Sequence, residues 1–270
     1  MSAVRQTIKR FTPQAVWDAA RWGVQTLQHG KQWPLARFHP WRRHSISQLA
    51  MLKDAHRGER CFIIGNGPSL KQTDISLLKN EYTFGMNRIY LAFPHWGFQS
   101  TYFIAINSLV IEQCAEEIRS LKMPKFLSWR SRGLIEPTED IIFLHTTYTG
   151  EKFSRDIRGR VWEGATVTYT ALQLAFYMGF EQVILIGVDH NFKSKGPPNT
   201  TVVSRGDDPD HFDTTYFGKG FRWQLPDLET SEQAYQLALS VFSQANRQVL
   251  DATVGGKLTV FPKVDYNSLF

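Results

Sequence analysis

Residues 65–70, with the sequence Gly-Asn-Gly-Pro-Ser-Leu, form the pattern in this chain that is best suited to holding an anion. They follow the apolar run 60–64, which has the length and β-branching of a buried parallel strand. Glycines let a backbone approach a phosphate closely, and a helix beginning near Ser69 would direct free N–H groups at the same anion. The spacing matches neither the dinucleotide fingerprint nor the Walker P-loop. We therefore expect a mononucleotide site that includes Gly65, Asn66, Gly67, Pro68 and Ser69.

Polar residues also stand at the ends of three later apolar runs. Asn87 and Asn107 each end one run, and Asp189 and His190 follow another. Open α/β sheets bind ligands at the carboxyl ends of their strands, so these residues are expected to share one edge. A carboxamide offers a donor and an acceptor to a base or a ribose. Asp189 could orient His190, or it could bind a ribose or a metal ion.

The long segment 191–222 is rich in Gly, Pro, Asp and Thr and has no hydrophobic periodicity. Long loops inside compact domains are typically lids or disordered segments, and we predict a lid. His211 is the preferred general base because it lies on this lid, and His190 is the alternative. Lys219 and Tyr216 could stabilise the charge on a leaving phosphate. The acidic residues of the loop either bind Mg²⁺ or are simply solvated: Asp207, Asp208 and Asp210.

The elements that must position these residues alternate between strands and helices. This alternation predicts an α/β fold, a Rossmann-like, doubly wound and mostly parallel sheet of a GT-A-like variant. We expect a catalytic domain over 58–270 and a basic, aromatic, helical extension over 1–57. The predicted strands are 60–64, 82–87, 101–106, 125–128, 141–144, 182–188 and 249–250. The predicted helices are 46–57, 109–121, 166–178 and 230–246.

The positive charge of the chain is concentrated at its beginning. The net charge is +6, and residues 1–45 carry eight Lys or Arg residues and one Asp. The remainder has no basic stripe, which argues against a nucleic-acid partner. A helix is predicted over 13–28, followed by breaks at Gly30, Pro34 and Pro40. This segment either lies on an anionic membrane surface or docks on the body of the protein or on a second subunit of a homo-oligomer.

Other features of the composition indicate the compartment. No run of 18 or more apolar residues is present, and the first ten residues lack the apolar core of a secretory signal. The two cysteines, Cys61 and Cys114, stand in apolar contexts without metal-ligand spacing. We therefore expect a cytoplasmic protein, peripheral at the inner membrane face if the extension binds lipid.

Three short motifs together resemble the nucleotide site of the single-domain bacterial sialyltransferases, glycosyltransferase family 42. They are residues 65–70, Met86-Asn87-Arg88 and Ile106-Asn107-Ser108-Leu109, and a later block over 166–189 agrees. Over residues 60–270 the chain is most similar to a related group, the 6-hydroxymethylpterin diphosphokinase MptE-like family. Three positions depart from the sialyltransferase pattern: Asn191 replaces a Tyr, Lys219 replaces the catalytic His, and 166–168 reads Thr-Val-Thr instead of Thr-Ser-Gly.

The resemblance implies roles for individual residues. It implies that Asn66 and Gly67 contact the phosphate and ribose of a nucleotide, and that Asn87 and Asn107 read the ribose and the base. The other nucleotide-binding residues that it implies are Thr166, Thr168, Gly187, Asp189 and Tyr216. The expected catalytic residues are His211, His190, Lys219 and Asp189, and no set of metal ligands is assigned.

Three functions fit these observations. The favoured one is a glycosyltransferase without a required cofactor, which transfers a sugar from a CMP-sugar or another nucleotide-activated donor. Its acceptor would be an envelope glycan or a lipid-linked glycan. The alternative is a diphosphokinase that needs Mg²⁺ and acts on a hydroxymethyl-pterin-like alcohol. The third is a nucleotide-binding protein without catalytic activity.

Overall fold

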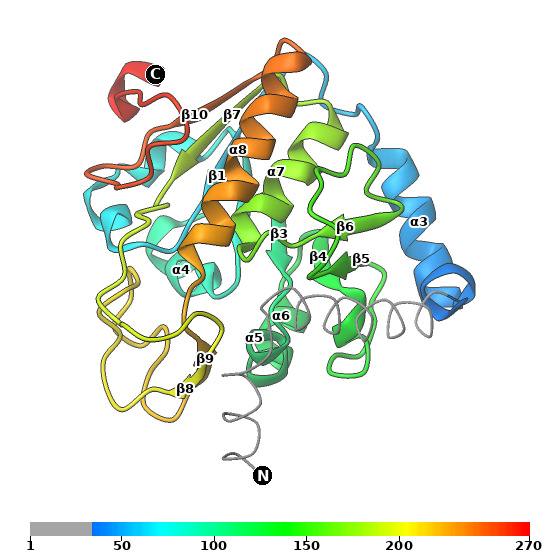
Figure 1. The fold of residues 1–270 in the computed structure, drawn as a ribbon, viewed down its shortest axis with the longest axis horizontal. Helices are drawn as coiled ribbons and strands as arrows, with labels where there is room; N and C mark the ends of the chain where they lie inside the picture. Colours follow the sequence, from blue (N-terminus) through cyan, green and yellow to red (C-terminus); the bar gives the residue numbers. More distant parts are fainter. Residues whose placement is uncertain (1–33) are drawn as a thin grey trace, which may run out of the picture.

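The computed structural model describes residues 34–270, so the helix predicted over 13–28 lies outside the described residues. A central sheet is covered by helices on both faces (Figure 1). Successive residues of the first strand point to opposite faces, and they join two separate buried clusters. Cys61 and Ile63 belong to one cluster, and Phe62 and Ile64 belong to the other. The predicted α/β fold is therefore confirmed.

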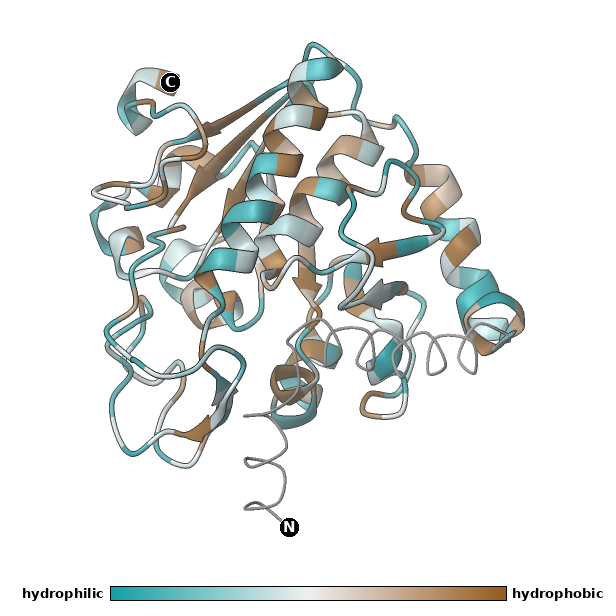
Figure 2. Ribbon diagram, viewed as in Figure 1, coloured by the Kyte–Doolittle hydropathy of each residue, from teal (hydrophilic) through white to brown (hydrophobic). Residues whose placement is uncertain are grey.

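The main sheet has eight strands, and every neighbouring pair in it is parallel. Its order is β10-β7-β1-β2-β3-β4-β5-β6. The strands are hydrophobic along most of their length (Figure 2). Their bounds are β1 (Arg60–Ile64), β2 (Tyr82–Met86), β3 (Tyr102–Ala105), β4 (Lys125–Ser128), β5 (Ile141–Thr147), β6 (Arg160–Trp162), β7 (Gln182–Ile186) and β10 (Gln248–Asp251).

The direction of winding reverses at β1. From β1 the chain adds β2 to β6 on one side, and it then returns to place β7 and β10 on the other side. Ligands of doubly wound sheets bind in the crevice at the carboxyl ends of strands where the order reverses. The turns that follow β1 and β7 therefore define the place where a site is expected.

Two long helices cover one face of the sheet, α7 (Val167–Met178) and α8 (Leu228–Gln244). Shorter elements supply the second cluster: η1 (Pro68–Gln72), η2 (Ile75–Leu78), η3 (Ile89–Ala92), α4 (Phe93–Trp96), α5 (Ser108–Gln113), α6 (Ala115–Ser120), η4 (Trp129–Ser131) and η5 (Tyr266–Leu269). The helix predicted over 109–121 is divided at Cys114, whose φ is −128°. Ile111, Cys114 and Ile118 still enter one buried cluster.

Helix α3 (Pro40–Leu52) begins six residues before the predicted start at Ile46. Pro40, which we expected to break helical structure, is the first residue of α3. Proline suits the first turn of a helix because its fixed φ is helical and that N–H has no partner there. Ser45 of α3 accepts a 2.9 Å hydrogen bond from the Phe143 N–H, so α3 packs directly on β5. The division of the chain at residue 57 stays a prediction.

The predicted lid is an ordered loop that contains a small antiparallel hairpin. Strands β8 (Thr201–Val203) and β9 (Arg222–Gln224) form this hairpin at the carboxyl end of the main sheet. The loop is largely hydrophilic, in contrast with the sheet (Figure 2). It is tied to the glycine turn by a 2.8 Å hydrogen bond from the Phe212 N–H to the Asn66 carbonyl oxygen.

Candidate functional site

A cleft of about 740 Å³ lies at the carboxyl ends of the strands, within the size range of small-molecule sites. Its walls come from the turns after the strands, the beginnings of α7 and α8, and the lid. Most of the residues predicted from the sequence meet here: Gly65, Asn66, Gly67, Asn87, Asn107, Thr166, Thr168, Gly187, Asp189, His190, His211 and Tyr216. Three predicted residues do not line the cleft. Pro68 and Ser69 lie behind the turn, and Lys219 is exposed elsewhere on the lid.

The glycines of residues 65–70 allow two strand-end turns to touch. A Cβ atom on Gly67 would lie 1.8 Å from Oδ2 of Asp189, and one on Gly65 would lie 2.2 Å from the carbonyl oxygen of Gly187. The N–H of Gly65 donates to the Ile186 carbonyl at 2.8 Å, and that of Gly67 donates to the Gly187 carbonyl at 2.9 Å. Close packing of the β1 and β7 turns therefore requires glycine at both positions.

Asp189 is held by Ser69, the second residue of η1. Ser69 donates its backbone N–H to Oδ1 at 3.1 Å and its hydroxyl to Oδ2 at 2.6 Å. Burial raises the pKa of Asp189, although these two hydrogen bonds oppose the shift. The N–H groups that we expected to point freely at an anion are thus engaged with protein acceptors at Gly65, Gly67 and Ser69.

The amide oxygens of Asn66 and Asn87 are buried and have no hydrogen-bond partner among the described residues. Asn66 uses its Nδ2 to donate to the Met86 carbonyl at 3.1 Å, which turns its oxygen away from that strand. A buried acceptor left unpaired costs about 1–3 kcal/mol, so this pair is suited to ligand hydroxyl or amino groups. Asn107 differs, because its oxygen caps α5 by accepting the Leu109 N–H at 2.9 Å.

Unusual backbone conformations gather around this cleft. Within residues 34–270, six residues other than glycine have positive φ, and four of them line the cleft. Those four are Asn87, Ala165, His190 and Asn199. Such conformations cost free energy and are found where function requires a particular geometry. Their concentration here makes the cleft the candidate functional site.

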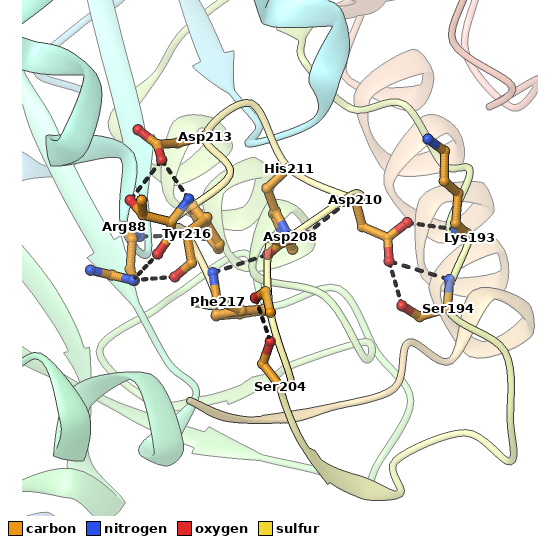
Figure 3. Close-up of polar contacts among 12 residues, drawn as sticks. Arg88, Lys193, Ser194, Ser204, Asp208, Asp210, His211, Asp213, Tyr216 and Phe217 are labelled. Carbon is orange, nitrogen blue, oxygen red and sulfur yellow. Dashed lines mark hydrogen bonds and ion pairs between the residues drawn. The ribbon is translucent and has the colours of Figure 1, made fainter. Parts of the chain in front are cut away.

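His211 is oriented by a carboxylate of the lid (Figure 3). Its Nδ1 lies 2.8 Å from Oδ2 of Asp208, and its ring stacks on Tyr216 with 4.0 Å between centroids. Burial of Asp208 would raise the pKa of its carboxyl, but the hydrogen bonds from His211, Asp210 and Phe217 lower that pKa overall. Within the described part of the chain, nothing hydrogen-bonds to Nε2 of His211, so this nitrogen is available to hydrogen-bond to a substrate.

The other lid carboxylates have distinct surroundings. Asp210 accepts the hydroxyl of Ser194 at 2.6 Å, and Asp207 is exposed. No group of three or more His, Cys, Asp or Glu side chains within residues 34–270 is arranged to hold a metal ion. A requirement for Mg²⁺ stays a prediction.

His190 pairs with a residue that the sequence did not indicate. Its Nε2 lies 2.8 Å from Oε1 of Glu232 on α8. Tyr235, also on α8, has its hydroxyl 3.4 Å from Oγ1 of Thr166, which caps α7. Both partners come from a helix far along the chain, and no local motif signals them. The beginnings of α7 and α8 are thereby joined at the cleft.

A comparison with protein families identifies the family. The sequence profile of the family described as 6-hydroxymethylpterin diphosphokinase MptE-like matches residues 40–195. The chain belongs to this family. The matched region contains the glycine turn, both cleft asparagines, Asp189 and His190, and it ends before His211. No curated protein matches the chain.

The solved structure of the MAf glycosyltransferase from Magnetospirillum magneticum AMB-1 resembles this MptE-like protein. The TM-score is 0.50 and the sequence identity is 16%. The match covers 85% of this chain and 39% of that chain, so the MptE-like protein spans well under half of the larger enzyme. At this identity the likeness shows a shared fold. No helix within residues 34–270 of the MptE-like protein is long and apolar enough to cross a membrane.

The cleft of the MptE-like protein is acidic. Among the described residues that line it there is no Lys or Arg. Its carboxylates are those of Glu151, Glu163, Asp189, Asp210 and Asp227. Each added negative charge on a ligand is therefore unfavourable here unless a cation or a hydrogen-bond donor accompanies it.

Glu163 is the functional candidate that sequence reasoning missed. It directly follows β6, is 5% exposed, and is paired with Arg130, which follows β4. Burial raises the pKa of Glu163, against the opposing influence of Arg130. The two residues are 33 positions apart, so only the fold reveals the pair.

Proposed function

We propose that the protein is a glycosyltransferase that uses a nucleotide-activated sugar. One observation carries this proposal: His211, oriented by Asp208, lines the same cleft as the unpaired amide oxygens of Asn66 and Asn87. A general base thus faces a pocket that presents acceptors to the hydroxyl groups of a nucleoside. The name of the structural neighbour, a glycosyltransferase, supports the same class of reaction.

The proposed chemistry begins at Nε2 of His211. This nitrogen takes the proton of an acceptor hydroxyl while that oxygen forms a bond to the anomeric carbon of the donor sugar. The bond from the anomeric carbon to the phosphate oxygen breaks, and the nucleotide leaves with the electron pair. The Asp208 carboxylate stabilises the imidazolium that forms. Helix α7, which begins at the cleft after Thr166, contributes positive potential toward the leaving phosphate.

The charge of the cleft supports a donor with little phosphate charge. A CMP-sugar carries one phosphate, whereas other sugar donors carry a diphosphate and ATP carries a triphosphate. Because the described lining lacks Lys and Arg, a single phosphate is the most easily accommodated. CMP-sugars are therefore the favoured donors, and no metal cofactor is required in this proposal.

The acceptor is proposed to be a glycan or a lipid-linked glycan near an anionic membrane. This part rests on the basic and aromatic residues 1–45. Within the described portion, Phe38 and Trp41 are exposed, and Arg37 and Arg43 are exposed beside them. Aromatic and basic side chains together favour the surface of anionic lipids. Peripheral attachment at the cytoplasmic face is the corresponding location.

A diphosphokinase is the second candidate, and the description of the family favours it. Transfer of pyrophosphate from ATP to an alcohol requires Mg²⁺ to neutralise the phosphates. The acidic cleft makes such a cation more necessary, since no described Lys or Arg lines it. Asp189 would be a ligand in that case, because its carboxylate stands at the switch point of the sheet.

Nucleotide binding and turnover by the full-length chain test the proposal. Thermal melting is recorded with CMP, UMP, GDP and ATP, each with Mg²⁺ and with a chelator. Free CMP is then measured after incubation with a CMP-activated sugar and a glycan acceptor. We expect CMP to stabilise the protein without metal and the CMP-sugar to be consumed. Stabilisation by Mg-ATP alone would contradict the glycosyltransferase and favour the diphosphokinase, and CMP binding without consumption of any CMP-sugar would indicate a non-catalytic protein.

A further inference from the structure

The cleft has a second end, at the carboxyl ends of β5 and β6. Tyr148 follows β5, and the residue remains 60% exposed although it lines the cleft. The indole N–H of Trp162, at the end of β6, donates to the Tyr148 carbonyl at 3.2 Å. This bond fixes the backbone that carries the Tyr148 ring. An aromatic platform is therefore held at the solvent side of the cleft.

Arg130 fixes both the platform and a carboxylate beside it. The centre of its guanidinium lies 3.9 Å from the centroid of the Tyr148 ring. The same guanidinium pairs with Glu163 and donates to the Thr146 carbonyl at 3.3 Å. Because Arg130 covers one face of the ring, the exposed surface belongs to the other face and the edge. Arg130 itself does not line the cleft.

The chemistry of this end suits an uncharged ligand. Glu163 is 5% exposed and its charge is balanced by Arg130, so its carboxylate can accept hydrogen bonds from hydroxyl groups. Glu151 is exposed at the same end, and no described Lys or Arg faces the ligand. Anionic groups are disfavoured here by the carboxylate of Glu151. A flat apolar surface beside hydroxyl acceptors is a binding arrangement for a neutral sugar.

This end is separate from the nucleotide end. Strands β3 and β4 lie between β2, which leads to Asn87, and β5, which leads to Tyr148. Three strand spacings of about 4.8 Å place about 14 Å between the two ends, which leaves space for a donor sugar between a nucleoside and a second sugar. Because the donor occupies the nucleotide end and the space between, the Tyr148 end is left for the acceptor.

We propose that Tyr148 and Glu163 form the acceptor subsite, and that it binds a neutral sugar at the end of a glycan. The sugar stacks its C–H face on the exposed face of Tyr148 and donates hydroxyl groups to Glu163. The exposure of Tyr148 lets the rest of the glycan extend into solvent. This inference rests on the proposed glycosyltransferase function, whose donor occupies the other end.

Direct binding of simple glycosides to the full-length protein tests the subsite. The probes are the p-nitrophenyl glycosides of galactose, glucose and N-acetylglucosamine, with the p-nitrophenyl glucuronide as the anionic comparison. Dissociation constants are measured by ligand-observed NMR with the protein saturated with CMP. We expect at least one neutral glycoside to bind, and the glucuronide to bind about tenfold more weakly or not at all. Tyr148→Ala should weaken the neutral probe about tenfold.

Two matched measurements separate binding from folding and from the proposed reaction. Tyr148→Phe keeps the ring and its contact with Arg130, so it should retain both the glycoside affinity and the melting temperature of the wild type. CMP affinity should be unchanged in both variants, because Tyr148 lies at the other end of the cleft. The proposal is overturned if no neutral glycoside binds, if Tyr148→Ala binds as the wild type does, or if the glucuronide binds equally well. CMP release from a CMP-sugar with a glycan acceptor present is measured separately. Its absence contradicts the glycosyltransferase, while glycoside binding that depends on Tyr148 would still establish a neutral-sugar site.

Discussion

The Ser69 hydroxyl donates a 2.6 Å hydrogen bond to Oδ2 of Asp189, although the two residues are 120 positions apart in the chain. The Ser69 backbone N–H adds a second bond to the same carboxylate at 3.1 Å. Ser69 belongs to the turn after β1, and Asp189 follows β7. This clamp joins the two turns at the switch point of the sheet, and Asp189 lines the cleft there.

Removal of the clamp hydroxyl should destabilise the protein. Hydrogen bonds to charged groups contribute about 1.5–3 kcal/mol, so Ser69→Ala should lower the free energy of unfolding by an amount in this range. Urea denaturation measures the change. Ser76→Ala is the matched control, because the Ser76 hydroxyl also lies 2.6 Å from a carboxylate, that of Asp74, but on the exposed surface. Equal losses in the two variants would contradict a special role for the clamp.

A methyl group on Gly67 should separate the two turns. Its Cβ would lie 1.8 Å from Oδ2 of Asp189, so the carboxylate or the backbone must move. Overpacking of this kind costs about 1–3 kcal/mol, and Gly67→Ala should show such a loss in urea denaturation together with weaker CMP binding. Gly133→Ala serves as the control, since a Cβ there has no atom within 4 Å. A Gly67→Ala protein with wild-type stability would show that the turns do not need this contact.

The lid should loosen in acid through Asp208. The folded protein lowers the pKa of this carboxyl from the usual 3.8, so its contribution to stability is complete above that value and is lost as the pH falls through the lowered pKa. Hydrogen exchange of the Phe217 N–H, which donates to Asp208 at 3.0 Å, reports the effect. Its protection factor should fall below about pH 4 in the wild type.

Substitution of Asp208 separates this effect from general acid unfolding. Asp208→Asn should show reduced protection of Phe217 at neutral pH already, whereas the exposed neighbour Asp207→Asn should behave as the wild type does. Unchanged protection in Asp208→Asn would mean that the carboxylate does not hold the lid.

The acidic cleft predicts the order of nucleotide affinities without metal. Because no described Lys or Arg lines it, each added phosphate should weaken binding in the presence of a chelator. CMP should therefore bind more tightly than CDP, and CDP more tightly than CTP, in calorimetric titrations. Addition of Mg²⁺ should strengthen CTP binding most. Tightest binding of CTP under chelation would contradict the charge assignment.

The sequence predicted the parts of the fold that are specified locally. Fully buried strands such as β1 and β7 appear as unbroken apolar runs, and the glycine turn stands directly after one of them. Strand β6 has only three residues and an exposed Arg160, so no run marks it. The predicted start of α3 was wrong because a proline such as Pro40 can either break a helix or stand in its first turn.

The sequence predicted those residues of the candidate site that lie at the carboxyl edge of the sheet. Asn66, Asn87 and Asp189 follow parallel strands, so they had to meet. The hydrogen-bond partner of each site residue could not be predicted from the order of the strands. The Ser69 N–H donates to Asp189, and Arg130 pairs with Glu163, only because distant segments of the chain pack together. The roles of individual donors therefore required the structure.

The most direct test of the central claim is the effect of His211 on sugar transfer. CMP release from a CMP-sugar in the presence of a glycan acceptor is measured for the wild type, His211→Ala and the control His95→Ala, which alters an exposed histidine on α4. If His211 is the general base, His211→Ala should lower kcat by about 10²–10⁴-fold, whereas CMP affinity and His95→Ala should remain at wild-type values. A kcat of His211→Ala equal to that of the wild type would contradict the account.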